Sequence, residues 1–136
     1  LDESARLLRE RGVSALMNFG GQLLAVGAPE GARGWRVVVP GRAEPLLLRD
    51  ASAATAGNSE QPGHIVDPRT GERLLSRPAV TVIAPSAAEA DGWDTALFVA
   101  GPGNPSGRCA LFEGRKTTPD ACTPYVGATN PNGASQ

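Results

Sequence analysis

The sequence has no excess of positive charge, no long hydrophobic run and no signal pattern. Its 13 basic and 14 acidic residues give a formal net charge of −1. Because they are mixed along the chain, they form no basic stripe for a nucleic acid backbone. No apolar run approaches the roughly 20 residues that cross a bilayer, and the N-terminus lacks a basic-then-apolar signal segment. The sequence therefore predicts a soluble chain without a transmembrane segment or a nucleic acid partner.

Cysteine is also scarce. Cys109 and Cys122 are the only two, and they have neither CxxC spacing nor a companion histidine, which argues against zinc. They are compatible with one disulfide if the protein is exported, or with two free thiols in a reducing compartment. The sequence does not choose between these states.

The chain length of 136 residues and a hydrophobic content of 40% suit one domain with a modest core. Residues 2–11 combine good helix formers with a stop at Gly12, which predicts an amphipathic helix. Short apolar runs bounded by turn residues then predict the strands of a mostly antiparallel sheet. These runs are residues 13–19, 22–28, 35–40, 45–49 and 79–84. The pattern indicates an α+β fold with helices flanking the sheet.

A second helix is predicted at residues 87–100, with Ser86 as its N-cap and Glu89 at the capping-box position. We expect its residues 97–99 to enter the core. After Gly101 the composition changes to Gly, Pro, Asn, Ser and Thr, with one apolar run at 109–112. We therefore place a domain at residues 1–103 and an irregular tail, with a mobile end, at residues 104–136.

The most informative segment is HIVDPRTG at residues 64–71, which contains the only histidine of the chain, His64. Apolar residues 65 and 66 favour an extended backbone, and Asp67-Pro68 sets up a turn that Gly71 can close. The segment gathers an imidazole, a carboxylate, a guanidinium and a hydroxyl near the end of a strand. Taken alone, it is compatible with a surface turn that carries one stray histidine.

Two further patterns have a plain structural interpretation beside a functional one. Asp91 and Thr95 are four residues apart, so both side chains project from one face of the predicted helix and could converge on a cation. They could equally form a solvated face or local hydrogen bonds. Gly20-Gly21 could be a simple hairpin turn, or a turn whose backbone amides approach a ligand closely.

Four segments together resemble the FAD:protein FMN transferases, the ApbE-type flavin transferases. In that family a histidine is followed three residues later by Asp-Pro-x-Thr-Gly, as in residues 64–71. Residues 14–21, SALMNFGG, resemble the family's strand ending in Asn-x-Gly-Gly. Residues 54–57, ATAG, resemble its Ala-Thr-Ser-Gly turn, and residues 89–98, EADGWDTALF, its metal-binding helix. The resemblance spans about residues 2–102 and occurs in the family's order.

The resemblance implies an ApbE-like fold and a phosphoryl transfer, in which a threonine of a target flavoprotein attacks the FMN phosphorus of FAD and AMP leaves. It implies that Asp91 and Thr95 are Mg²⁺ ligands, with Asp94 sharing part of their face. His64 is the natural base, because histidine titrates near neutrality.

The resemblance further implies that several residues bind the FAD substrate, whereas Arg69 could contact phosphate or simply fix the turn. The residues expected to contact FAD are Gly20, Gly21, Thr55, Gly57, Asp67 and Thr70. We assign no function to Trp93.

The chain also departs from the family pattern. Ala56 stands where the family usually has Ser, and Asn58 where Asp is common. The family chain is more than twice as long, and its N-terminal half supplies much of the flavin pocket and a backbone ligand of the metal. Asp2 matches the residue that closes this missing segment.

We therefore expect another polypeptide to supply the N-terminal half if the chain is active. The alternatives are a module that binds FAD or a nucleotide without transfer, and an accessory subunit that has kept the domain without activity. The resemblance leaves the location open between the bacterial cell envelope and the cytoplasm.

Overall fold

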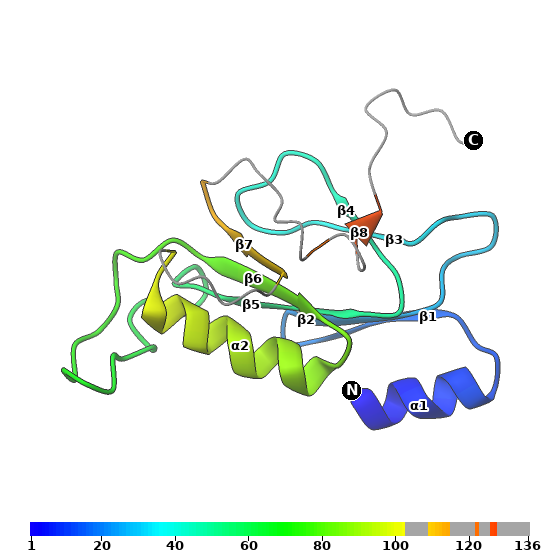
Figure 1. Cartoon of the computed structure of the whole chain (residues 1–136), viewed down its shortest axis with the longest axis horizontal. Coiled ribbons are helices and arrows are strands. Elements are labelled where there is room, and N and C mark those ends of the chain that lie inside the picture. The colour runs from blue at the N-terminus through cyan, green and yellow to red at the C-terminus, as the bar shows by residue number, and fades with distance from the viewer. Residues whose placement is uncertain (103–108, 115–121, 123–125, 128–136) are drawn as a thin grey trace.

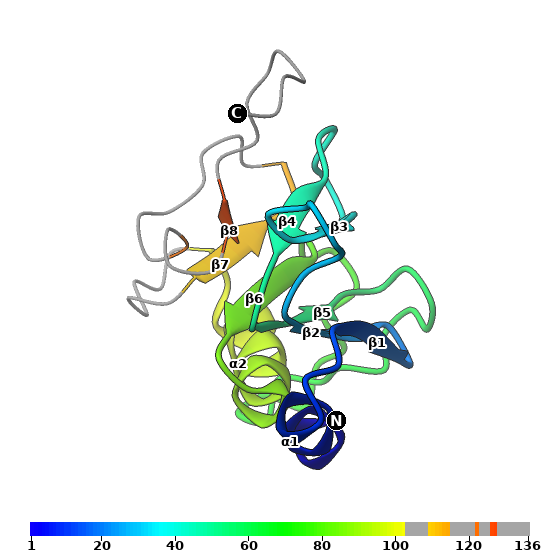
Figure 2. The same ribbon diagram turned by 90° about the vertical axis from the view of Figure 1, so that its right-hand side faces the viewer.

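The computed structural model describes residues 1–102, 109–114, 122 and 126–127. Over these residues the fold is α+β, as the sequence predicts, and it has three layers (Figures 1 and 2). Two helices form one outer layer, a five-stranded sheet lies in the middle, and a small three-stranded sheet forms the other outer layer. No helix in the described residues is long and apolar enough to span a membrane.

The middle layer is an antiparallel sheet with the strand order β1-β2-β5-β6-β7. Its strands are β1 (Ala15–Phe19), β2 (Gln22–Val26), β5 (Ser52–Ala56), β6 (Val80–Ala84) and β7 (Cys109–Phe112). Strand β6 is buried along its whole length because helices cover one face of the sheet and the small sheet covers the other. Such a strand reads as a continuous apolar run rather than an alternating one.

The small sheet consists of β3 (Trp35–Val37), β4 (Leu46–Leu48) and β8 (Val126–Gly127) in the order β3-β4-β8. Its buried side chains meet one face of the main sheet in a single apolar cluster. The disulfide between Cys109 and Cys122 lies inside this cluster, and both cysteines are buried. The structure thus selects the first of the two cysteine states that the sequence left open.

Helices α1 (Asp2–Glu10) and α2 (Ala87–Ala100) cover the opposite face of the main sheet (Figure 1). Leu97 and Phe98 of α2 pack with Val80 and Val82 of β6, which confirms the predicted core face. Ala5 of α1 packs in a separate cluster with residues of β2 and the start of α2. Both helices therefore bury an apolar face on the same sheet.

The N-terminus of α2 is fixed by side chains from two parts of the chain, Ser86 and Asp2. Ser86 Oγ accepts a hydrogen bond from the amide of Glu89 at 3.2 Å, which confirms Ser86 as the N-cap. The Asp2 carboxylate accepts from the amides of Ala87 and Ala88 at 2.7 and 3.0 Å. Although desolvation opposes the effect, these amide bonds hold the pKa of the Asp2 carboxyl below its usual value. These acceptors satisfy amides that the helix itself leaves without partners.

The structure corrects two sequence interpretations. Residues 54–57 were interpreted as a turn, whereas residues 52–56 form β5 in the middle of the sheet. Small residues hid this strand: Ala53, Ala54 and Ala56 have low intrinsic strand preference, and packing against α2 and the small sheet stabilises them instead. Second, the tail expected to be irregular contains β7 and β8. The expected mobile end of the tail lies outside the described residues.

The remaining element predictions are confirmed, with shorter bounds for each of the predicted strands. Helix α2 has the predicted bounds of residues 87–100, and α1 ends one residue before the predicted end. Because β7 pairs with β6, the main sheet continues past residue 103. The division of the chain into a domain and a tail at residue 103 stays a prediction, based on the change in amino-acid composition there.

Candidate functional site

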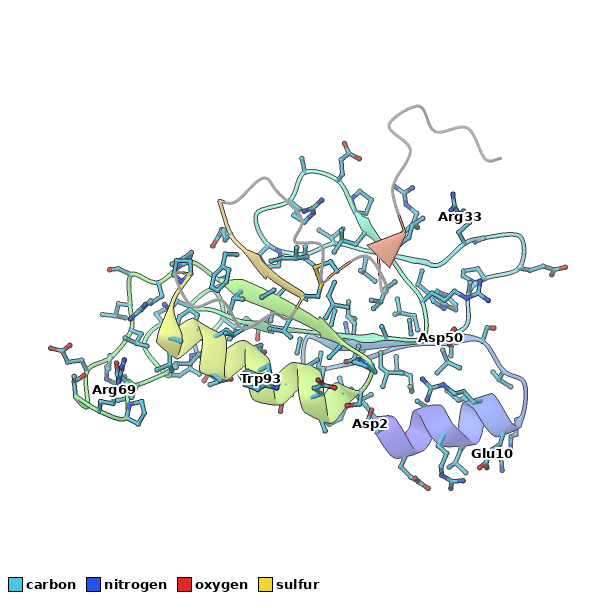
Figure 3. All side chains as sticks on the ribbon, in the orientation of Figure 1. Asp2, Glu10, Arg33, Asp50, Arg69 and Trp93 are labelled. Atoms are coloured by element: carbon cyan, nitrogen blue, oxygen red, sulfur yellow. A yellow bond between two sulfur atoms is a disulfide. The ribbon has the colours of Figure 1, made fainter. Side chains whose placement is uncertain are left out.

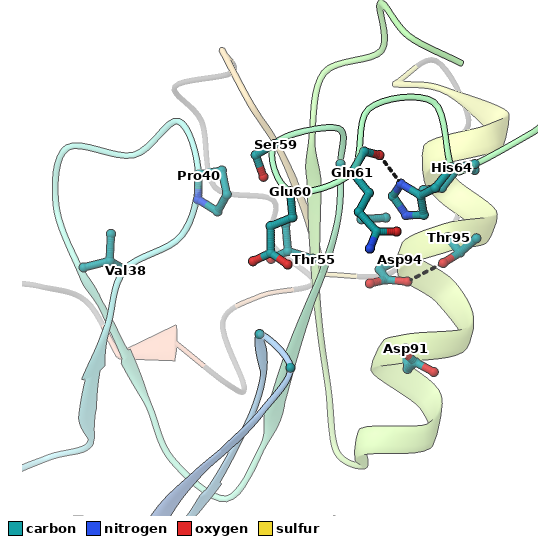
Figure 4. A pocket seen from close by; sticks show the side chains of 15 residues that line it. Val38, Pro40, Thr55, Ser59, Glu60, Gln61, His64, Asp91, Asp94 and Thr95 are labelled. Atoms are coloured by element: carbon teal, nitrogen blue, oxygen red, sulfur yellow. Dashed lines mark hydrogen bonds between the residues drawn. The ribbon is translucent and has the colours of Figure 1, made fainter. Parts of the chain in front are cut away.

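A cleft of about 540 Å³ opens beside the C-terminal end of β5, between the β1–β2 turn, the loop after β5 and the exposed side of α2 (Figure 4). Most of the predicted site residues line it. Its lining residues are Gly20, Gly21, Val38, Pro40, Thr55, Ala56, Gly57, Ser59, Glu60, Gln61, His64, Ile65, Asp91, Asp94 and Thr95. The cleft thus brings together residues that are up to 75 positions apart in the sequence.

Gly20 and Gly21 form the two-residue turn of the β1–β2 hairpin, since Phe19 pairs with Gln22. Both glycines have positive φ, +60° and +91°, as the favoured two-residue hairpin turn requires. Within the part of the chain that the structure describes, no atom lies within 4 Å of a Cβ built on either residue, so here glycine is needed for its backbone conformation. The amide of Gly21 donates to Asn18 Oδ1 at 3.1 Å.

Thr55 and Gly57 lie at the end of β5. The Thr55 hydroxyl pairs with that of Thr81 across the β5–β6 ladder at 2.8 Å. Gly57 has a packing reason to lack a side chain, because a Cβ there would lie 3.0 Å from the Cβ of Ala79. Both residues line the cleft, and their predicted contact with FAD stays a prediction.

His64 is exposed in the cleft, and its ring lies above Asp94 and Thr95 of α2 in the close view (Figure 4). Its Nδ1 is hydrogen-bonded to the backbone carbonyl of Gln61. Because a carbonyl oxygen only accepts, Nδ1 must carry the proton in this arrangement. The neutral ring then has its lone pair on Nε2, which is the state that a general base needs.

Asp67 and Thr70 do not line the cleft; they organise the turn that follows His64. The Asp67 carboxylate accepts from the Arg69 amide at 2.9 Å and from the Arg69 guanidinium at 3.0 and 2.7 Å. The Arg69 side chain, and then its amide, lower the pKa of the Asp67 carboxyl to about 2. Thr70 Oγ1 accepts from the Glu72 amide at 3.2 Å, and Gly71 closes the turn with φ +75°.

The turn therefore lies apart from the other predicted site residues, at one end of the molecule, as Arg69 in Figure 3 shows. The side chains of Asp67 and Thr70 both have hydrogen-bond partners within this segment. For Asp67 and Thr70, direct contact with FAD stays a prediction.

Helix α2 presents three oxygen-bearing side chains to the cleft: Asp91, Asp94 and Thr95. Asp91 and Thr95 are exposed, whereas Asp94 is only 5% exposed. Burial raises the pKa of the Asp94 carboxyl to about 6, and the Asp91 charge acts in the same direction, against two hydrogen bonds from Thr95. A carboxylate held in this environment gains from a nearby cation.

The donor set fits a small hard cation. Thr95 Oγ1 donates its proton to Asp94 Oδ1 at 2.9 Å, which leaves the lone pairs of the hydroxyl oxygen available as a ligand. Asp91 adds an exposed carboxylate one helical turn away. Mg²⁺ is bound in proteins by one or two carboxylates, with water and substrate phosphate oxygens completing its shell.

The burial of Asp94 adds to the sequence interpretation, in which this residue only shares part of the face of Asp91 and Thr95. A local signal for burial was present, since Asp94 lies three residues before the buried Leu97 on the same helix. The contributions of Val38 and Pro40 to the lining had no local signal, because the long β3–β4 connection reaches the cleft only through the packing of the two sheets.

Comparisons with known proteins identify the family of the chain. Residues 1–111 match the ApbE family. The chain is 35% identical over 118 aligned residues to the FAD:protein FMN transferase of Klebsiella pneumoniae strain 342, covering 74% of this chain and 34% of that protein. It is 34% identical over 118 residues to the enzyme of the same name from Escherichia coli K12, again covering 74% of this chain and 34% of that protein.

Solved structures of ApbE flavin transferases are also similar to this chain. The flavinyl transferase ApbE of Pseudomonas stutzeri, in its apo form, superposes with a TM-score of 0.70 at 29% identity, covering 95% of this chain and 49% of that one. The flavin transferase ApbE of Vibrio cholerae shares the fold with a TM-score of 0.74 at 24% identity, covering 91% and 48%. The chain spans about a third to a half of the length of these relatives. With the family matched over residues 1–111, the chain belongs to the ApbE family.

Proposed function

We propose that this chain provides part of the active site of a Mg²⁺-dependent FAD:protein FMN transferase and that another polypeptide segment completes it. The observation that carries the proposal is the cleft, because Gly20, Gly21, His64, Asp91 and Thr95 line one space. A diphosphate, its metal and a base must share such a space for phosphoryl transfer.

In this proposal His64 is the general base. The target threonine hydroxyl gives its proton to Nε2 of His64, while the hydroxyl oxygen forms a bond to the FMN phosphorus. The bond from that phosphorus to the oxygen of AMP breaks, and AMP leaves with the bonding electrons. The hydrogen bond from Nδ1 to the Gln61 carbonyl holds the ring in the tautomer that this role requires.

Asp91 and Thr95 would hold Mg²⁺ from the side of α2. Asp94 Oδ1 accepts a hydrogen bond from Thr95 Oγ1, which leaves the lone pairs of the hydroxyl oxygen available to the cation. The cation would offset negative charge on the FAD diphosphate when bound. The β1–β2 turn and the end of β5 would lie along the flavin nucleotide, where glycine permits a close approach of the backbone.

An accessory role without catalysis is the second candidate. One observation favours it: the described residues contain no group of three or more His, Cys, Asp and Glu side chains that could hold a metal. Two oxygen ligands from one helix make a weak Mg²⁺ site. We therefore expect that the chain alone transfers no FMN.

The test is a chimera in which residues 1–111 replace the matching part of the Klebsiella pneumoniae relative. It is mixed with FAD, Mg²⁺ and a target protein that contains Ser-Gly-Ala-Thr, and covalent FMN fluorescence is read on a denaturing gel. We expect Mg²⁺-dependent labelling that falls at least about 100-fold in His64→Ala, as for loss of a general base. Asp91→Ala should abolish Mg²⁺-dependent FAD binding.

Glu89→Ala is the matched control, because Glu89 is an exposed acid of the same helix that does not line the cleft. FAD binding without labelling in the chimera would favour a binding module, and neither binding nor labelling would favour the accessory role. Strong labelling by the 136-residue chain alone would contradict the requirement for a second segment.

A further inference from the structure

The side chain of Asn58 connects two segments of the loop between β5 and β6 that carries His64: the residue before His64, and residues 74–75 farther along the loop. Its Nδ2 donates to the carbonyls of Leu74 and Leu75, at 2.7 and 3.1 Å, and its Oδ1 accepts from the amide of Gly63 at 3.0 Å. Only an amide can fill all three positions, because it has donors at one end and an acceptor at the other. A carboxylate, which is common at this position in the family, has no proton to donate to a carbonyl.

The Gly63 peptide is held from its other side as well. Arg73 Nη1 donates to the carbonyl of Gly63 at 3.0 Å, so side chains engage both backbone polar groups of the residue before His64. Gly63 is buried with φ +72°, and a Cβ there would lie 2.9 Å from Leu75 Cδ2. This position therefore has little freedom to move or to accept another residue.

The residue after His64 is anchored to the helix that carries the proposed metal ligands. Ile65 is 8% exposed and packs in one cluster with Leu97 and Phe98 of α2. Its carbonyl accepts from the amide of Leu74 at 3.0 Å, next to the carbonyl that Asn58 engages. His64 thus has an exposed side chain, while its two neighbours in the sequence, Gly63 and Ile65, are held by hydrogen bonds and packing.

We propose that Asn58 and Arg73 are positioning residues for His64, acting through the Gly63 peptide. They fix the backbone that brings His64 Nδ1 to the Gln61 carbonyl, and so select the tautomer with a lone pair on Nε2. The importance for catalysis rests on the proposed function, whereas the effect on the loop and the ring does not. Asn58, which stands where Asp is common in the family, then adds hydrogen bonds to the loop, and its side chain does not line the cleft.

The structural test uses the whole chain, because its single histidine gives one pair of imidazole signals, Nδ1 and Nε2, in a ¹⁵N-detected spectrum. Amide exchange at Gly63 is measured on the same samples. The variant Asn58→Asp keeps the shape and the acceptor but places a carboxylate against two carbonyl oxygens. Asn18→Asp is the matched control, because among the described residues the Asn18 side chain only accepts, from Gly21.

At pH 8 we expect Asn58→Asp to show both neutral tautomers of His64 and to speed exchange at Gly63 on the order of 10-fold, as for a lost buried hydrogen bond. Lowering the pH until the new carboxyl is protonated should recover part of the Gly63 protection, since the acid can then donate to one carbonyl. Asn18→Asp should match the wild type in both measurements. A single tautomer and unchanged Gly63 exchange in Asn58→Asp would overturn the proposal.

Arg73→Gln keeps the test decisive if Asn58→Asp does not fold, because the Arg73 side chain is exposed and the fold should tolerate its loss. It should also produce mixed tautomers, and an unchanged imidazole spectrum would overturn the proposal.

In the active chimera, Asn58→Asp should lower kcat about 10-fold with little change in KM for FAD, since the base is misplaced while the nucleotide site is intact. An equal kcat would remove the catalytic part of the proposal. An inactive parent chimera would instead count against the proposed function, and the ring and exchange results would stand independently.

Discussion

The buried carboxyl of Asp94 should make the stability of this protein fall as the pH rises from about 4 to about 6. Asp94 is 5% exposed, and burial, reinforced by the Asp91 charge, raises its pKa from 3.8 to about 6. Between these values the native state keeps a proton that the unfolded chain releases. The free energy of unfolding must therefore decrease across this window and level off above it.

The size of the effect follows from the shift. A change of about two pKa units corresponds to an upper limit of about 3 kcal/mol. Because Asp94 lines an open cleft, solvent screens part of this energy, and we expect about 1–2 kcal/mol. The stabilisation by the protonated Asp94 carboxyl is fully present below pH 4 and is lost above pH 6.

Asp94→Asn removes the charge while an oxygen remains to accept from Thr95 Oγ1. The variant should be about 1–2 kcal/mol more stable than the wild type at pH 7 and equal to it near pH 3.5. Urea unfolding from pH 3.5 to 8, in EDTA to remove divalent cations, measures the difference directly. The gain in stability should come with weaker Mg²⁺ dependence in the active chimera, as for many acids buried at functional sites.

Asp91→Asn is the matched control, because Asp91 is exposed and its charge is the weakest of the influences on Asp94. It should leave most of the slope between pH 4 and pH 6 in place. The reasoning fails if the stability difference between Asp94→Asn and the wild type is the same at pH 4 and pH 7.

Three further predictions concern stability. Replacing Cys109 and Cys122 by serine should cost roughly 3 kcal/mol, the value for a closed loop with a separation of 13 residues, and thermal melting with and without reductant checks it. Asp2→Ala should cost about 1–2 kcal/mol in urea unfolding, because it leaves two amides of α2 without their acceptor, and a change below 0.3 kcal/mol, within roughly the error of such measurements, would contradict this. The contribution of Asp67 should be present above pH 4 and lost as the pH falls toward about 2, and Arg69→Met should remove this acid transition in a pH titration of unfolding.

The sequence predicted those parts of the fold whose signals are local. The N-cap at Ser86 and the apolar spacing of Leu97 and Phe98 gave α2 its bounds, since capping and helical periodicity are read within a few residues. Strand β5 was missed because its alanines carry no strand signal of their own. Its place in the centre of the sheet depends on neighbours that are distant in the sequence.

The same distinction applies to the site. The spacing of Asp91 and Thr95 on one helix face could be derived from the sequence, and the cleft contains both. The burial of Asp94 and the three bonds of Asn58 could not, because each depends on a segment whose position only the folded chain defines. In the sequence, Asn58 in place of the family's common Asp indicates only the loss of a charge. In the structure, the side-chain amide of Asn58 donates two hydrogen bonds that a carboxylate could not donate.

The two sides of the cleft are also mechanically connected. Gln22 follows directly after the Gly20-Gly21 turn, and its Nε2 donates to the carbonyl of Ala87 in the first turn of α2 at 2.6 Å. Asp2 holds the first amides of the same helix from α1. A shift of α2 along its axis would therefore break bonds to both β2 and α1. The proposed metal ligands are on α2 and the proposed nucleotide contacts are on the β1–β2 turn. The three hydrogen bonds from Gln22 and Asp2 therefore maintain the spacing on which a shared diphosphate would depend.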